Sequence, residues 1–391
     1  MPEINKIKDD KNKKKIKIGS WIITYNPAGT HLMSSLGFEW LCIDLEHTTI
    51  TFDQMEILIS IIESNGTTPF VRVGSNDKLY IKKALDAGAQ GIIIPMVNTA
   101  QEAKEAIEAT YYYPKGKRGV GWAKAQNFGY NFNQYFKSKS HKIKDDKNKK
   151  KIKIGSWIIT YNPAATHLMS SLGFKWLCID MEHSTITFDQ MEILISIIES
   201  NDAVPFVRVG SNDKLYIKKA LDAGAQGIIV PMVNTVEEAK EAIDATYYYP
   251  KGKRGVGWAK AQNFGYNFDQ YIKNKSDKIQ LIFQIESIEA IQNLNKILDL
   301  KNITGTILGP YDLSASLGVL GQLESPLVKN AIKKYEEISL KKKTPMGIHI
   351  TQPNPNKIKL FHNKRYKLIA SGNDMIFLGN SCKDFLKKLS S

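Results

Sequence analysis

The chain has few cysteines, only three in 391 residues. Cys42 and Cys178 each lie inside an apolar, strand-like run, and Cys382 stands alone. Small secreted domains that depend on disulfides carry many more cysteines, whereas buried single thiols are typical of a reducing compartment. The sequence therefore predicts a cytoplasmic protein without a disulfide framework.

Long apolar runs are also absent. No segment approaches the ~18 uninterrupted apolar residues that a membrane-spanning helix needs. Residues 1–17 are rich in charge and have no apolar centre, unlike a signal peptide. We therefore expect no membrane partner.

Acidic side chains are in the minority, with 39 Asp and Glu against 54 Lys and Arg, so the formal net charge is +15. Such a balance is found in proteins that bind nucleic acids or membranes. Here, however, the lysines are spread over expected helix faces and loops. No RNA-binding aromatic motif, zinc-ligand spacing or recognition helix accompanies them. We interpret the charge as a solvated surface and expect no nucleic-acid partner.

The most informative feature is an internal repeat. Residues 8–143 recur as residues 144–279 with a constant offset of 136, and about 15 positions differ. Two long, unequal copies do not make a solenoid. Only the second copy continues into new sequence, residues 280–391, so chemistry that needs those residues can be complete in one copy alone. We predict two domains, a duplicated N-terminal half at 1–143 and a complete domain at 144–391.

Short apolar runs alternate with helical patterns through the second copy and its continuation. Runs without polar alternation favour parallel strands that are buried on both faces. Eight such strands in ~250 residues are typical of a TIM-type (β/α)8 barrel. A doubly wound open sheet is the alternative, but it needs a glycine-rich phosphate turn after its first strand, which Gly155-Ser156-Trp157 does not provide. The expected strands are residues 152–159, 176–179, 205–209, 227–232, 280–285, 305–308, 346–350 and 366–370.

On this count the first copy holds four of the eight βα units. It is half a barrel, and both edges of its sheet would lack a neighbouring strand, which is a liability for aggregation or for pairing with another chain.

Ionisable side chains interrupt five of the expected strands near their carboxyl ends, where barrel active sites are built. Charged groups in buried strands are costly unless they are paired or functional. The sequence therefore predicts an active site at this end of the barrel. The side chains are Asp180, Glu182 and His183 after the second strand, Arg208 in the third, Glu286 after the fifth, Asp312 after the sixth and His349 in the seventh.

Glu286 and Asp312 are one βα unit apart, so they would point from neighbouring strands into the same volume. Two converging carboxylates suit a hard divalent cation, Mg²⁺ or Mn²⁺, with Co²⁺ as a third candidate. The alternative interpretation is a pair of structural acids, with Asp312 as a helix N-cap.

The remaining candidates each have a structural alternative. Arg208 suits a carboxylate or enolate oxygen of a substrate. His183 is either catalytic or a buried core histidine. Asp222 is either functional or simply the last residue of a helix before Gly224, and Trp157 could belong to the core.

From residue 151 onward the chain resembles the class II, metal-dependent pyruvate aldolases of the HpcH/HpaI type. The resemblance rests on eight landmarks in the same order, which together cover nearly the whole segment. They are Gly155-Ser156-Trp157, Asp180-x-Glu182-His183, Val207-Arg208-Val209, Leu221-Asp222-x-Gly224-Ala225, Pro231-Met232-Val233-Asn234, Gly252-x-Arg254-Gly255-Val256-Gly257, Gln284-Ile285-Glu286 and Gly309-Pro310-x-Asp312-Leu313-Ser314.

The resemblance implies a role for each candidate residue. Glu286 and Asp312 would bind the metal, and Arg208 would face the enolate oxygen of pyruvate. His183 would move protons together with Asp222, the latter supplied by a neighbouring subunit. Substrate contacts would come from Trp157, Gln284, Gly309, Pro310 and Tyr311. Members of the family are commonly hexamers that exchange a terminal helix, so the resemblance also implies a homo-oligomer.

The implied reaction is the reversible cleavage of a 4-hydroxy-2-oxoacid into pyruvate and an aldehyde. No lysine stands at a strand end for a Schiff base, which argues against the metal-independent mechanism. Two departures, His349 in place of an apolar residue and Lys260 in place of arginine, concern aldehyde specificity. The alternatives are an acyl-CoA carbon–carbon lyase like the citrate lyase β subunit, and a degenerate, non-catalytic duplicated protein.

Overall fold

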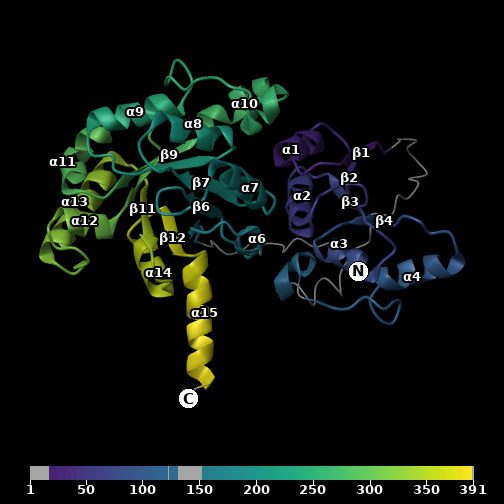
Figure 1. The fold of residues 1–391 in the computed structure, drawn as a ribbon. Coiled ribbons are helices and arrows are strands. Elements are labelled where there is room, and N and C mark those ends of the chain that lie inside the picture. Colours follow the sequence, from purple (N-terminus) through teal and green to yellow (C-terminus); the bar gives the residue numbers. More distant parts are fainter. Residues whose placement is uncertain (1–16, 122, 131–151, 390–391) are drawn as a thin grey trace. The chain divides into compact units, whose positions relative to one another are not determined.

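The structure is a computed structural model that describes residues 17–121, 123–130 and 152–389. The chain divides into two compact units, Met1–Lys150 and Lys151–Ser391. We describe each by itself and call them the first and the second unit (Figure 1).

The second unit is a closed barrel of eight parallel strands in the order β10-β11-β12-β5-β6-β7-β8-β9. This confirms the predicted (β/α)8 fold. The strands are β5 (Ile154–Ile158), β6 (Trp176–Asp180), β7 (Val204–Arg208), β8 (Gly227–Val230), β9 (Gln280–Ile285), β10 (Gly305–Leu308), β11 (Met346–Ile350) and β12 (Leu368–Asn373). The helices are α6 (Pro163–Ser171), α7 (Phe188–Glu199), α8 (Lys214–Asp222), α9 (Val236–Thr246), α10 (Phe268–Asn274), α11 (Ile288–Ile297), α12 (Pro310–Ser316), α13 (Pro326–Lys342), α14 (Pro355–Asn363) and α15 (Asp374–Leu389).

The last strand differs from its sequence-based bounds. It was expected at residues 366–370, but Tyr366 belongs to the turn after α14, where its N–H donates to Phe361 O at 3.0 Å. The strand instead runs on through Ser371, whose carbonyl accepts a hydrogen bond from Ser156 Oγ at 2.9 Å. A run of apolar residues could not show this extension, because the residues that close the barrel against β5 are polar.

Two layers of apolar side chains hold the barrel together. The outer layer lies between strands and helices and includes Leu177, Val207, Leu281 and Leu294. The inner layer fills the barrel with Trp157, Trp176, Cys178, Phe206, Ile229, Ile282, Ile307 and Ala370. The strands from the repeated segment therefore supply the aromatic volume, and β9 to β12 supply smaller side chains.

Two glycines make room for those aromatic rings. A Cβ on Gly155 would lie 2.0 Å from the Trp176 ring, and one on Gly227 would lie 2.2 Å from the Phe206 ring. Because any larger residue would displace a ring from a close-packed interior, these positions require glycine.

The first unit is a separate sheet of four parallel strands in the order β1-β2-β3-β4. Its elements repeat those of β5 to α9, as expected for half a barrel. They are β1 (Gly19–Ile22), α1 (Pro27–Ser35), β2 (Trp40–Asp44), α2 (Phe52–Ser64), β3 (Thr68–Arg72), α3 (Lys78–Asp86), β4 (Gly91–Ile93) and α4 (Ala100–Thr110). Trp21 is 39% exposed in this unit, whereas its counterpart Trp157 is 3% exposed inside the barrel.

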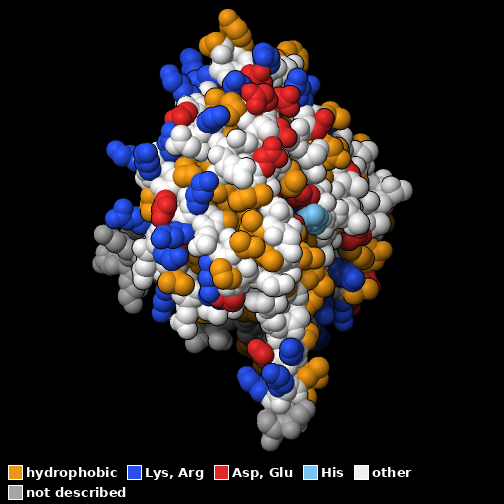
Figure 2. Space-filling view, turned by 90° about the vertical axis from the view of Figure 1, so that its left-hand side faces the viewer, with side chains coloured by type: hydrophobic (Ala, Val, Ile, Leu, Met, Phe, Trp, Pro, Cys, Tyr) orange, Lys and Arg blue, Asp and Glu red, His pale blue; other side chains and the backbone are white. Residues whose placement is uncertain are grey.

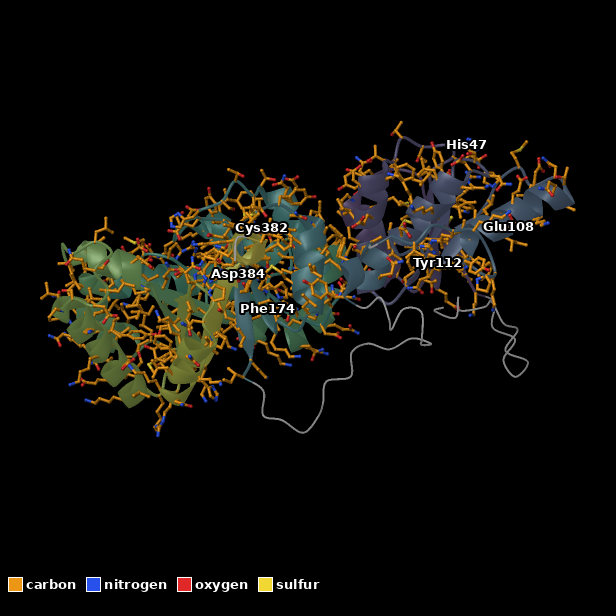
Figure 3. All side chains as sticks on the ribbon, turned by 90° about the horizontal axis from the view of Figure 1, so that it is seen from below. His47, Glu108, Tyr112, Phe174, Cys382 and Asp384 are labelled. Carbon is orange, nitrogen blue, oxygen red and sulfur yellow. The ribbon has the colours of Figure 1, made fainter. Side chains whose placement is uncertain are left out.

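The C-terminal helix α15 projects away from the barrel (Figure 1). It is anchored near its start, where the Phe377 ring lies 5.8 Å from Phe174 (labelled in Figure 3), and its outer part exposes Leu378, Phe385 and Leu386. Figure 2 shows basic side chains scattered over the visible face with acidic ones between them, in agreement with a solvated surface. No helix among the described residues is long and apolar enough to cross a membrane.

Candidate active site

Arg208 is the best-fixed side chain at the carboxyl ends of the strands. It ends β7, directly beside Asp180 at the end of β6. Its Nε and one terminal nitrogen donate to the two Asp180 carboxylate oxygens at 2.9 and 2.6 Å, and the other terminal nitrogen lies 3.0 Å from Glu182 Oε2. The guanidinium also lies 4.5 Å from the Trp157 ring centroid. A bidentate pair and a ring contact together fix the plane of the guanidinium.

The charges of this cluster depend on one another. Burial alone would lower the pKa of Arg208, but the hydrogen bonds to Asp180 and the nearby Glu182 raise it above its ordinary value. Burial raises the pKa of Glu182, although Arg208 opposes the shift. Arg208 therefore remains a cation inside the barrel mouth. Asp180 and Glu182 were noted in the sequence only as strand-end acids, and the structure shows that they position Arg208.

Glu286 follows β9 directly and is 3% exposed. Its Oε1 accepts the Met232 N–H at 2.7 Å, and its Oε2 accepts a hydrogen bond from the Gln284 amide. Burial raises the pKa of Glu286, the two hydrogen bonds lower it, and the charge of Asp312 raises it further. Arg208 also acts on this pKa, so the structure brings Glu286, Asp312 and Arg208 together as predicted.

Met232 presents its N–H from an unusual backbone conformation, with φ 52° in the left-handed region. The loop that carries it is held by α9, because Glu238 Oε2 accepts the N–H groups of Asn234 and Thr235 at 2.7 and 2.9 Å. A strained residue that is fixed by its surroundings often marks a functional site. The sequence carried no signal for this contact beyond the landmark that contains Met232.

The segment after β10 places Asp312 beside Glu286. Gly309 is the N-cap of α12, Pro310 begins the helix, and Asp312 lies within the first turn. The interpretation of Asp312 as an N-cap is therefore wrong. A Cβ on Gly309 would lie 2.8 Å from Glu286 Cβ and 3.0 Å from its Oε2, so only glycine permits this approach. Tyr311 and Asp312 are both exposed at the mouth.

The donor set fits a hard divalent cation. Glu286 and Asp312 offer carboxylate oxygens, and each Glu286 oxygen keeps a free lone pair besides its hydrogen bond. A cation would also relieve the repulsion that raises the pKa of Glu286. Among the described residues no three His, Cys, Asp or Glu side chains gather closely enough to hold a metal. Two protein ligands leave room for water and substrate oxygens, as Mg²⁺ prefers.

His183 and Asp222 lie outside this cluster. The His183 side chain is 67% exposed, with Nε2 3.8 Å from Glu182 Oε2, so the interpretation as a buried core histidine is wrong. Asp222 ends α8 shortly before β8 begins, which places it at the amino ends of the strands. There its Oδ1 accepts a hydrogen bond from Arg254 at 2.6 Å. The structure therefore does not bring Asp222 to the Arg208 cluster of the same chain.

His349 extends the stack of side chains behind Arg208. Its ring lies 5.2 Å from the Trp157 ring, and its Nε2 lies 3.0 Å from Gly372 O. Burial lowers its pKa to about 4, so the imidazole is neutral near pH 7. Lys260, the other departure, lies elsewhere in a buried pair with Glu199 at 3.2 Å and next to Ala223 O.

A closed parallel barrel with a fixed arginine and two converging carboxylates at its carboxyl ends is the arrangement of a barrel enzyme. The family model for "HpcH/HpaI aldolase/citrate lyase" matches residues 17–150 and, a second time, residues 153–378. The chain belongs to this family of carbon–carbon lyases, which confirms the resemblance seen in the sequence.

Curated relatives and solved structures agree with this assignment. Proteins of Escherichia coli and Salmonella dublin, both named 4-hydroxy-2-oxo-heptane-1,7-dioate aldolase, are 38% and 39% identical over 46% of this chain and over 70% and 69% of their own lengths. A family protein from Burkholderia cenocepacia J2315 superposes with a TM-score of 0.59 at 27% identity, over 62% of this chain and 96% of that one. The corresponding values for an HpcH/HpaI aldolase from Desulfitobacterium hafniense DCB-2 are 0.58, 26%, 62% and 93%.

Proposed function

We propose that the second unit is a divalent-metal-dependent aldolase that cleaves a 4-hydroxy-2-oxoacid reversibly into pyruvate and an aldehyde. The observation that carries the proposal is the convergence of Glu286, Asp312 and Arg208 at one end of the barrel. Oxygen ligands for a cation then stand next to a fixed, permanently charged donor.

The proposed reaction breaks the bond between C3 and C4 of the oxoacid. The C4 hydroxyl loses its proton and becomes the aldehyde carbonyl, while the electron pair of the broken bond forms the enolate of pyruvate. Protonation of the enolate at C3 completes the turnover. Mg²⁺ or Mn²⁺ held by Glu286 and Asp312 would act as a Lewis acid toward the oxoacid oxygens.

Each side chain then has a defined task. Arg208 donates to the developing enolate oxygen, and Asp180 and Glu182 keep its guanidinium in place. Gln284 orients Glu286 through its amide. His183 is exposed at the mouth, which suits a base that takes the C4 hydroxyl proton on the aldehyde side.

Substrate binding is assigned to the walls of the same mouth. Trp157 lies under Arg208 and closes one side, and the segment Gly309, Pro310 and Tyr311 forms the other. Asp222 can take part only if another subunit brings it to this mouth, which agrees with the oligomer implied by the family. We therefore propose a homo-oligomer, to which the exposed apolar side of α15 contributes.

The duplicated N-terminal part, residues 1–143, lacks counterparts of Glu286 and Asp312, so we assign turnover to residues 144–391. We also retain the cytoplasmic location, because Cys42 and Cys178 are buried free thiols. The degenerate, non-catalytic alternative is disfavoured because every implied site residue is present in the second unit.

A second candidate function is cleavage of acyl-CoA thioesters, since the family includes citrate lyases. The matched Escherichia coli relative is named an aldolase, which favours free oxoacids. Measuring turnover of CoA esters and of free 2-oxoacids with the same preparation separates the two.

The decisive experiment measures pyruvate release from a panel of 4-hydroxy-2-oxoacids with and without added Mg²⁺, Mn²⁺ or Co²⁺. We expect release to require metal, to stop with EDTA and to be lost in Glu286→Gln and Asp312→Asn. Glu46→Gln, the matched change in the first unit, should leave metal dependence intact. Full activity of Glu286→Ala in the presence of EDTA would rule out the proposal.

A further inference from the structure

The first unit keeps an intact copy of the arginine cluster. Arg72 donates to both Asp44 oxygens at 2.9 and 2.6 Å, lies 3.2 Å from Glu46 Oε2 and lies 4.7 Å from the Trp21 ring. His47 is exposed beside it, as labelled in Figure 3. Met96 has the same left-handed φ, 54°, as Met232. Only the residues that β9 to β12 bring to the site are missing.

The sheet of the first unit has no cover on the face that is internal in the barrel. Within the described residues β1 and β4 are the edges of its four-stranded sheet. Trp40, Phe70 and Ile93 are partly exposed, whereas their counterparts Trp176, Phe206 and Ile229 are buried. Uncovered edges next to exposed apolar side chains are suited to pairing with further strands.

The second unit shows what fits such a face. There the barrel half made of β9 to β12 and α11 to α15, residues 280–389, pairs with β5 through β12 and with β8 through β9. Residues 154–158 and 18–22 are identical, and the β8 edge differs only by Val230 in place of Ile94. Asn234, which accepts hydrogen bonds from Ser287 and Asn293 across this interface, returns as Asn98.

A second copy of the first unit fits less well than this half. In the barrel the large rings of Trp176 and Phe206 pack against Ile282, Ile307 and Ala370. Two first units facing each other would place both sets of Trp21, Trp40 and Phe70 in one interior, and overpacking of this kind destabilises cores. They would also bring together two Arg72–Asp44–Glu46 clusters, each with one surplus negative charge.

We propose that the first unit binds residues 280–389 of a second copy of this chain by strand exchange. The exchanged barrel places Arg72 and Trp21 where Arg208 and Trp157 stand, and thus forms an alternative active site with Glu286 and Asp312. Because the two seams are nearly identical, the exchange preserves the packing interactions. Its extent depends on chain concentration and is set when the chains fold.

The test is complementation between inactive full-length chains, and its activity readout rests on the proposed function. Arg72→Ala/Arg208→Ala lacks both arginines but keeps a functional 280–389 half. Arg208→Ala/Glu286→Gln keeps only Arg72. Each alone is expected to be inactive, and refolding them together from urea should restore metal-dependent pyruvate release at least tenfold above either, more so at higher chain concentration.

The matched control mixes Arg72→Ala/Arg208→Ala with Arg72→Ala/Arg208→Ala/Glu286→Gln, which has no arginine to offer and should stay inactive. No recovery in the first mixture, with active wild-type chain refolded in parallel, would overturn the exchange while leaving the proposed function intact. Inactive wild-type chain would instead count against the proposed function.

A readout without catalysis uses the unmutated site. Ile18 is 61% exposed and corresponds to Ile154, the β5 residue that pairs with Ile369 of β12. A benzophenone amino acid at position 18 should cross-link to peptides around residue 369 of an isotope-labelled second chain after co-refolding. The same probe at Tyr113, exposed on a loop, should not. Cross-links from position 18 only to other regions would refute the proposal.

Discussion

Replacing Arg208 by Ala, and in parallel its duplicate Arg72 by Ala, tests the assignment of the active site to the second unit. Arg208 is 12% exposed and neutralises Asp180, which is 3% exposed. Removing one partner of a buried ion pair costs about 3–5 kcal/mol, because the other charge stays buried. Arg72 is 24% exposed, so its loss should cost about 1 kcal/mol, as for a pair closer to the surface.

The effect on turnover should be larger and confined to one copy. Loss of a single donor to a developing oxyanion typically lowers kcat about 10²- to 10³-fold. Arg208→Ala should show this loss at temperatures where the variant is still folded. Arg72→Ala should keep most of its activity, because Glu286 and Asp312 adjoin the second copy.

Pyruvate release and urea unfolding, measured on both variants, supply the two quantities. Added guanidinium ion should restore part of the Arg208→Ala activity by occupying the vacated pair with Asp180. A purely structural defect would not respond in this way. Equal losses of turnover in the two variants would refute the assignment to the second unit.

The remaining predictions concern other parts of the second unit. Gly309→Ala should weaken activation by Mn²⁺ at least tenfold in a metal titration, because its Cβ would meet Glu286, whereas Gly257→Ala, which meets nothing within 4 Å, should titrate like the wild type. The pKa of His349 falls from an ordinary 6.5 to about 4 on folding, so its neutral form contributes up to ~3 kcal/mol above pH 6.5 that is lost progressively toward pH 4. Urea unfolding of His349→Leu should therefore lose less stability between pH 7 and 5 than the wild type, and an unchanged slope would contradict the burial argument. Residues 144–391 alone should be soluble, metal-dependent and at least as active per site as the full chain, and inactivity of that shorter chain would show that the first copy is part of the catalytic fold.

The barrel and the general position of its site were predictable from the sequence. Apolar runs marked the strands, and Arg208, Glu286 and Asp312 stood at strand ends, where a parallel barrel must gather them. The site residues themselves remain predictions until the variants are measured. The bounds of β12 were wrong, because Ser371 and Asn373 lack the apolar signal that marked the other strands.

Contacts between elements were not predictable. The Met232 N–H on Glu286 depends on a left-handed backbone, and the fit of Gly309 against Glu286 depends on the approach of α12. Neither leaves a periodic pattern in the residues that take part. The N-cap interpretation of Asp312 was wrong for the same reason, since the point at which α12 begins is set by Gly309 and Pro310.

The sequence by itself determined the duplication, the alternation of strands and helices, and the fact that only one copy is followed by Glu286 and Asp312. These properties are local or follow from chain order. Only the tertiary structure decided that Asp180 and Glu182 hold Arg208, that His349 stacks on Trp157, and that Asp222 lies at the other end of its own barrel. These last properties depend on register between strands and on the direction of side chains in a closed, packed interior. Two copies of nearly the same sequence accordingly bury Trp157 and expose Trp21, because only one of them is joined to the strands that close the barrel.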